Sequence, residues 1–113
     1  MAVVPDLLRG HIDTIILARL VHRESYGYEI GKNILTLSQG QYELKEAALY
    51  TAFRRLEEAG YLSSYWGDES TGARRRYYVI TPLGKSYLAD SKKNWRDTRK
   101  LIDWLLEEDA PHE

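Results

Sequence analysis

One long stretch near the C-terminus constrains the fold more than any other feature of this sequence. Thr81-Pro82 is typical of a helix start, with threonine as N-cap and proline at the first helical position. No proline interrupts the chain from Leu83 to about Glu108, so we expect a helix of roughly 26 residues, about 39 Å long. The whole chain has 113 residues, enough for one small domain. A helix this long extends beyond such a domain, and its far end must pack against something else.

The expected partner of this helix is a second copy of the chain. A 3-4-3-4-3 spacing, the a and d seam of a short coiled coil, runs through Leu88, Ser91, Trp95, Thr98, Ile102 and Leu105. Trp95 lies between the small residues Ser91 and Thr98, which leaves room beside its ring. Two interpretations follow: a bulky dimer anchor, which the residues alone favour, or a site for a flat ligand.

Three shorter helices are expected before the long one. Apolar residues recur at three- and four-residue intervals in the segments 6–22, 26–37 and 46–59. Asp6 is the expected N-cap of the first helix. Gly60 is the expected end of the third, because glycine readily adopts a positive φ.

The periodicity changes after Gly60. Segments 61–66 and 75–80 are rich in β-forming residues and flank a polar loop at 67–72, which predicts a β-hairpin. The resulting fold is mainly α with a small β-hairpin. Its order of elements is that of a winged helix-turn-helix in residues 1–81, followed by a C-terminal dimerisation helix and acidic tail in residues 82–113.

A winged helix-turn-helix places its third helix in the major groove of DNA and its hairpin on the neighbouring backbone or minor groove. The candidate DNA-binding residues are Lys32, Lys45, Tyr50, Thr51, Arg54, Arg74, Arg75 and Arg76. Net charge is only −1, so the basic surface is local, and many balancing acids lie at the C-terminus. In isolation the three consecutive arginines could equally be a solvated charge run; their place on the hairpin favours DNA.

Other functions find little support in the residues. The chain has no cysteine, hence no disulfide, thiolate metal site or cysteine nucleophile. Its three histidines are far apart, and no metal or other cofactor is expected. Glu57-Glu58 is expected to be a solvated helix face, since adjacent helical carboxylates point in different directions. An enzyme is therefore the weakest choice. A non-inducible DNA binder and a winged-helix protein-interaction module remain as alternatives.

The N-terminus has no basic segment followed by a long apolar run, so we expect a cytoplasmic protein without a membrane partner.

Several motifs resemble those of the PadR family of bacterial transcriptional repressors. They are Tyr26-Gly27-Tyr28-Glu29-Ile30, Ala48-Leu49-Tyr50, Arg55-Leu56-Glu57 with Gly60, and Gly72 followed by Arg75, Arg76, Tyr77, Tyr78, Thr81 and Gly84. The resemblance runs from about Leu8 to Gly84. It implies a homodimer that binds a pseudo-palindromic operator, often next to its own gene. The single C-terminal helix and the position of Trp95 are similar to the lactococcal multidrug-regulator branch.

That branch implies multidrug sensing, with planar aromatic molecules held between the two tryptophans of a dimer. By position, the walls of such a pore would be Leu7, Asp13, Thr14, Ser91, Trp95 and Arg99. Three residues depart from the branch. Arg99 replaces an acidic residue, although Asp13 and Asp103 could restore negative potential. Lys45 replaces a capping asparagine, and Ala48 replaces a hydroxyl, so shape and phosphate contacts are expected to contribute more to DNA recognition.

Overall fold

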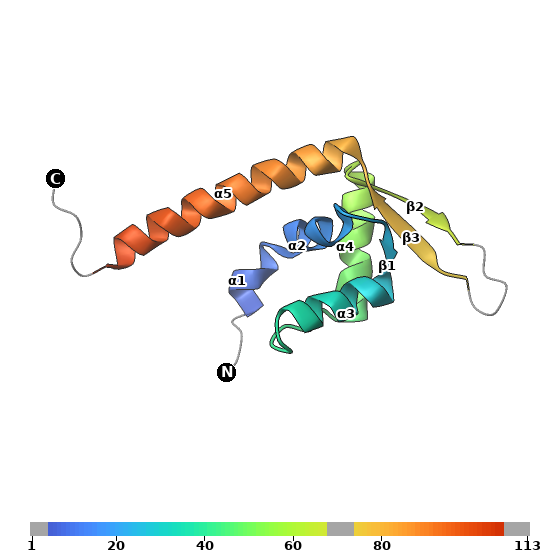
Figure 1. Cartoon of the computed structure of the whole chain (residues 1–113), viewed down its shortest axis with the longest axis horizontal. Helices are drawn as coiled ribbons and strands as arrows, with labels where there is room; N and C mark the ends of the chain where they lie inside the picture. The colour runs from blue at the N-terminus through green and yellow to red at the C-terminus, as the bar shows by residue number, and fades with distance from the viewer. Residues whose placement is uncertain (1–4, 68–73, 108–113) are drawn as a thin grey trace.

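The computed structural model describes residues 5–67 and 74–107 of the chain. Its elements, in order, are α1 (Pro5–Arg9), α2 (Ile12–Leu20), β1 (Ser25–Tyr26), α3 (Gly27–Leu37), α4 (Glu46–Glu58), β2 (Leu62–Trp66), β3 (Arg76–Ile80) and α5 (Pro82–Leu106). Helices α1 to α4 lie on one side of the small sheet, and α5 crosses above them and extends far beyond (Figure 1). The molecule is accordingly 64 Å long but only 33 Å and 21 Å across.

The predicted second and third helices and both hairpin strands are confirmed to within one residue at each end. The end of α4 is also as expected, because Gly60 has a φ of +86°. Residues 68–72 of the predicted loop and residues 108–113 of the predicted acidic tail lie outside the described part of the chain.

One core joins the helices to the sheet. Ile16, Leu17 and Leu20 of α2 pack with Ile30 and Ile34 of α3, Leu49, Ala52, Phe53 and Leu56 of α4, Leu62, Tyr78 and Ile80 of the sheet, and Leu88 of α5. The rings of Phe53 and Tyr78 stack with their centroids 4.1 Å apart. This contact fixes α4 against β3 of the hairpin. Helix α4 is the third helix of the expected winged helix-turn-helix.

The sheet has three strands rather than the two predicted. Its order is β1-β3-β2, with both pairs antiparallel. The additional strand β1 pairs Ser25 with Tyr78 and Tyr26 with Tyr77. The sequence pattern instead places Tyr26 in the helix expected over 26–37, because a strand of two residues shows no alternation of apolar and polar residues.

The single first helix predicted over 6–22 is wrong. The chain breaks after Arg9, where the His11 backbone is outside the helical region and its N–H donates to the Leu8 carbonyl at 2.8 Å. Gly10 makes the break inexpensive, because glycine costs about 1 kcal/mol in a helix interior. Asp6 lies inside α1 rather than at its N-cap, and its carboxylate pairs with Arg9 at 2.8 Å.

The long C-terminal helix is confirmed. The Thr81 hydroxyl accepts a hydrogen bond from the Gly84 N–H at 3.0 Å, and Pro82 occupies the first turn. Stacking of Tyr61 on Tyr87, 4.3 Å between centroids, holds the start of α5 to the hairpin. The helix ends at Leu106, two residues before the expected end. Within the described residues, no helix combines the length and apolarity needed to cross a membrane.

Candidate nucleic-acid interface

Helix α4 presents one polar face to solvent. Leu49, Phe53 and Leu56 point into the core, as predicted from their spacing. Tyr50, Thr51 and Arg54 are exposed on the opposite side. Lys45 is the N-cap residue and makes no side-chain cap, and its ammonium lies 3.3 Å from the Glu43 carboxylate. The first N–H groups of α4 therefore have no hydrogen bond from the N-cap side chain.

A groove lies between the hairpin, which we call the wing (β2 and β3), and the N-terminal ends of α3 and α4. We call it the wing groove; its volume is about 470 Å³, and it is lined by Tyr26, Gly27, Tyr28, Tyr50, Trp66, Arg74, Arg75, Arg76 and Tyr78. Tyr50 of α4 and all three predicted arginines thus share one surface. This is the chemistry of a phosphate-binding surface, with guanidinium groups beside aromatic rings.

All three wing arginines lie over aromatic rings, with the Arg76 guanidinium 5.8 Å from the centre of Trp66 and 5.9 Å from that of Tyr78. The Arg74 guanidinium lies 5.2 Å from the centre of the Trp66 ring, and that of Arg75 lies 4.6 Å from the centre of Tyr26. Such cation–π contacts reduce the number of positions a long side chain samples. Trp66 was missed as a candidate residue. Its place directly before the polar loop of the predicted hairpin was the available signal, and in the structure it pairs with Arg76.

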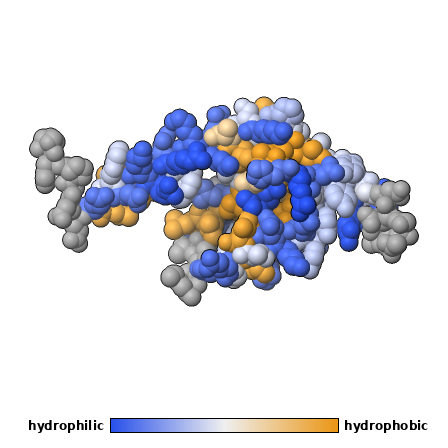
Figure 2. Space-filling view, viewed as in Figure 1, coloured by the Kyte–Doolittle hydropathy of each residue, from blue (hydrophilic) through white to orange (hydrophobic). Residues whose placement is uncertain are grey.

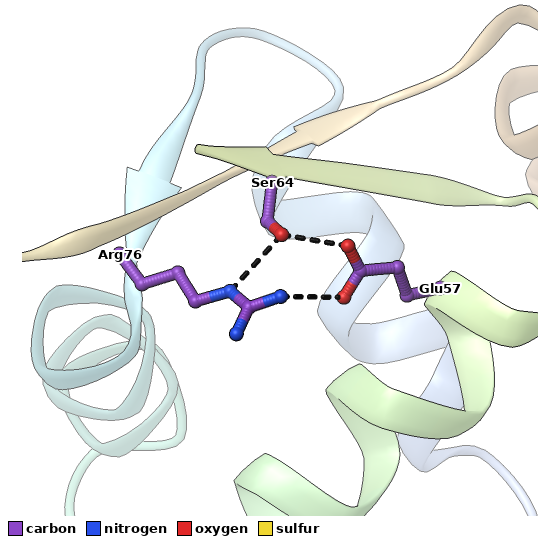
Figure 3. A network of polar contacts seen from close by, with 3 residues as sticks. All are labelled: Glu57, Ser64 and Arg76. Carbon is purple, nitrogen blue, oxygen red and sulfur yellow. Dashed lines mark hydrogen bonds and ion pairs between the residues drawn. The ribbon is translucent and has the colours of Figure 1, made fainter. Parts of the chain in front are cut away.

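Arg76 is also hydrogen-bonded to side chains of β2 and α4. Its Nε donates to the Ser64 hydroxyl at 3.0 Å, and its Nη2 lies 3.3 Å from Oε1 of Glu57 (Figure 3). The Ser64 hydroxyl donates in turn to Oε2 of Glu57 at 2.6 Å. The expectation of a solvated Glu57-Glu58 face is therefore wrong for Glu57, since both its carboxylate oxygens are engaged. Glu58 is exposed.

Lys32 lies outside the wing groove. It lines an adjoining cavity of about 450 Å³ between α3 and α4, together with Glu43 and Glu46. Both cavities share Tyr50, which stands between them. The structure thus brings Tyr50 and the wing arginines together, while Lys32 belongs to a surface of mixed charge.

The outer face of the sheet carries a row of tyrosines, one from each strand. Tyr77 of β3 meets Tyr26 edge-on at 5.5 Å and stacks on Tyr65 at 5.6 Å. The Tyr65 hydroxyl donates to Glu24 at 2.6 Å, and this hydrogen bond to a carboxylate raises the pKa of Tyr65. Burial raises the pKa of Tyr78 on the inner face. Neither tyrosine is charged near neutral pH, so the positive charge of the wing comes from its arginines.

The residues predicted to form a ligand pore lie on α1, α2 and α5. Trp95 is 44% exposed, and its ring meets that of His11 edge-on at 4.9 Å. Leu7, Thr98 and Arg99 are exposed, and Thr14 and Ser91 are half-buried. Asp13 binds the Arg55 guanidinium through both oxygens, one of them at 3.2 Å from Nε. This hydrogen bonding raises the pKa of Arg55. Asp13 therefore contributes little free negative charge near Trp95.

The predicted seam of α5 needs one correction. Leu88 is only 3% exposed and belongs to the core, so it is not available to a second chain. The helical spacing identified its face correctly but not the neighbour that covers it. Beyond Leu88, the exposed large apolar side chains of α5 are Trp95, Leu101, Ile102, Trp104, Leu105 and Leu106. Apolar surface is visible along the underside of the far end of α5 (Figure 2). Leu101, Trp104 and Leu106 were not predicted.

Comparisons with known proteins agree with this arrangement. A family model described as the transcriptional regulator PadR-like family matches residues 16–90. An uncharacterised protein of Lysinibacillus sphaericus is 42% identical over 102 residues, which is 90% of this chain and 94% of that protein.

Solved structures are similar over most of the chain. A transcriptional regulator from Clostridium thermocellum is 44% identical with a TM-score of 0.86, covering 94% of this chain and 100% of that one. A PadR family transcription regulator from Clostridium difficile is 35% identical with a TM-score of 0.76, covering 87% and 100%. The likeness therefore includes much of α5 as well as the winged region.

Proposed function

The chain belongs to the PadR-like family of transcriptional regulators, and we propose that it represses transcription as a homodimer bound to a pseudo-palindromic operator. In this proposal residues 1–81 bind DNA, and α5 with the following residues joins the two chains. The observation that carries it is the wing groove, where Tyr50 of α4 and the three wing arginines line one surface. Thr51 and Arg54 extend that surface along the exposed face of α4. Together they offer groups for base edges and for phosphates.

The test is fluorescence anisotropy with a labelled duplex from immediately upstream of this gene and a scrambled duplex of equal length, each at several salt concentrations. We expect tight, sequence-selective binding with a steep salt dependence. Arg74→Ala is expected to weaken binding to both duplexes alike and to reduce the slope of log affinity against log salt by about 1 per protomer.

Lys85→Ala is the matched control for Arg74→Ala. It also removes one positive charge from an exposed side chain, but from the start of α5, outside the wing groove and the proposed dimer surface. We expect the same affinity and salt slope as for the unmodified protein. Absence of DNA binding even at low salt would contradict the proposal and favour a protein-interaction module.

The proposed dimer forms through the far half of α5. The exposed apolar side chains there, from Trp95 to Leu106, are far more numerous than a solvent-exposed helix normally carries. A second copy of the same helix would cover them and leave both wings free for DNA. In such a two-fold dimer each contact occurs twice, so the apolar residues contribute in pairs.

The finer proposal is that planar aromatic compounds bind beside Trp95 in the dimer. A ligand there shifts operator affinity only if it favours one arrangement of the two α5 helices over another, and such coupling is typically about 1–3 kcal/mol. Because Asp13 is engaged by Arg55 and Arg99 is exposed, we expect anionic planar compounds to bind more tightly than cationic ones.

Trp95→Ala tests this site. Fluorescence titration with pyrene-1-sulfonate is expected to show about tenfold weaker binding to the variant, because stacking on the indole is lost. Operator binding by the variant is expected to persist. Ethidium, a planar cation, is titrated in the same way, so that the binding of a cationic compound is compared with that of the anionic sulfonate. If the variant becomes monomeric instead, Trp95 is a dimer anchor and the ligand proposal fails.

A further inference from the structure

The contacts of Arg76 tie the wing to the DNA-reading helix. Glu57 belongs to α4, Ser64 to β2 and Arg76 to β3, so three polar side chains join three elements (Figure 3). We call this group the wing anchor (Glu57, Ser64 and Arg76). It is closed, since Glu57 accepts from both partners and Arg76 also donates to Ser64. Moving the wing relative to α4 breaks at least two of these hydrogen bonds.

The wing anchor lies where the apolar core no longer holds the wing. Tyr78 and Ile80 are buried against the helices, whereas Arg76 and its cross-strand neighbour Trp66 are exposed. Apolar packing therefore fixes the base of the wing. Nearer the tip, the fixed connection to α4 is the hydrogen-bonded carboxylate of Glu57, aided by the Arg76 guanidinium lying 5.8 Å from the Trp66 ring centre.

Residues proposed to contact DNA flank the wing anchor on both sides. Arg54 is three positions before Glu57 on α4, so the two side chains share one side of the helix. Arg74 and Arg75 directly precede Arg76 at the start of β3. The wing anchor thus determines how far the wing arginines stand from the exposed face of α4, a distance that must match the separation of groove and backbone on DNA.

We propose that Glu57, Ser64 and Arg76 are positioning residues for operator recognition, and that Arg76 acts through Glu57 rather than as a phosphate contact. This inference rests on the proposed function and divides the arginine run into two roles. Arg74 supplies charge to the phosphates. Arg76 uses its charge within the protein and holds the other two at a fixed distance from α4.

The first test replaces Glu57 with glutamine and uses the same two duplexes and salt series. Glu57→Gln is expected to lower the ratio of operator to scrambled affinity about tenfold, the effect of losing one hydrogen bond to a charged group. The salt slope is expected to rise by about 0.9 per protomer, because the released Arg76 becomes free to neutralise a phosphate. A purely structural role for Glu57 would not increase that slope.

Glu58→Gln is the matched control, since it removes the same charge from the adjacent exposed position of α4. It is expected to keep the affinity ratio unchanged. Equal effects of Glu57→Gln and Glu58→Gln would overturn the inference, because they would reduce the role of Glu57 to its charge near DNA. If the unmodified protein prefers neither duplex, the proposed operator binding itself fails, and that outcome is seen before any variant is made.

Arg76→Gln is a second variant, which tests the inference even if Glu57→Gln does not fold. It is expected to lower the affinity ratio about tenfold while leaving the salt slope unchanged. Arg74→Ala should show the opposite pattern, a lower slope with an unchanged ratio. If Arg76→Gln lowers the slope as Arg74→Ala does, Arg76 is an ordinary phosphate contact and the inference is overturned.

Discussion

Gly84→Ala is expected to lower the free energy of unfolding by roughly 3 kcal/mol, the upper range for overpacking in a protein core. A Cβ atom at this position would lie 2.2 Å from the Tyr61 carbonyl oxygen and 2.8 Å from Cγ1 of Ile80. The carbonyl has little freedom to move away, because it accepts a hydrogen bond from the Thr81 N–H at 3.0 Å. The first turn of α5 must therefore shift off the hairpin.

Urea unfolding followed by far-UV circular dichroism, at one fixed protein concentration, measures this effect. Gly10→Ala is the control, because a Cβ atom there meets nothing within 4 Å. It is expected to change the unfolding free energy by less than about 1 kcal/mol. Similar midpoints for Gly84→Ala and the unmodified protein would contradict the close approach of α5 to Tyr61.

Leu105→Glu is expected to convert the proposed dimer into a monomer and to reduce operator affinity at least about a hundredfold, because bivalent binding is lost. Leu105 is 73% exposed in the single chain, so its substitution leaves the core intact. Burying this side chain contributes about 1.5–3 kcal/mol, and a two-fold dimer loses that contribution twice. Sedimentation equilibrium should show a mass of 13.1 kDa in place of twice that value.

Leu83→Glu is the matched control at the other end of α5. Its side chain is 56% exposed, and a carboxylate in the first turn of a helix is favourable. We expect this variant to remain dimeric and to bind the operator as before. A dimer that survives Leu105→Glu would show that the far half of α5 is not the interface.

The sequence predicts the helices and strands of this protein well because most of them bury one regular face. Leu49, Phe53 and Leu56 mark the inner side of α4, and they are buried in the structure. Strand β1 and the break at Gly10 were missed because each involves only one or two residues, too few for a periodic pattern. Both involve neighbours far along the chain: β1 pairs with Tyr77 and Tyr78, and His11 beside the break contacts Trp95.

The sequence predicts the arginines of the candidate interface, but it does not separate the proposed role of Arg76 from that of Arg74. Arg74, Arg75 and Arg76 are equivalent as a charge run, and only folding places Arg76 beside Glu57, 19 positions away. The same limit explains why Leu88 is predicted in the dimer seam but lies in the core of the single chain. A helical spacing identifies which residues share a face, but the core of the chain and a second chain can cover different parts of that face.

The length of α5 has a consequence for how such proteins diverge. Its 25 residues span about 37 Å, so a tilt of about 5° at the first turn displaces the last turn by about 3 Å, close to the 3.4 Å rise of one base pair. The stacking of Tyr61 on Tyr87 and the close contact at Gly84 hold this first turn against the hairpin. In the proposed dimer, substitutions at these positions would therefore change the half-site spacing of the operator while the proposed DNA-binding side chains stay the same.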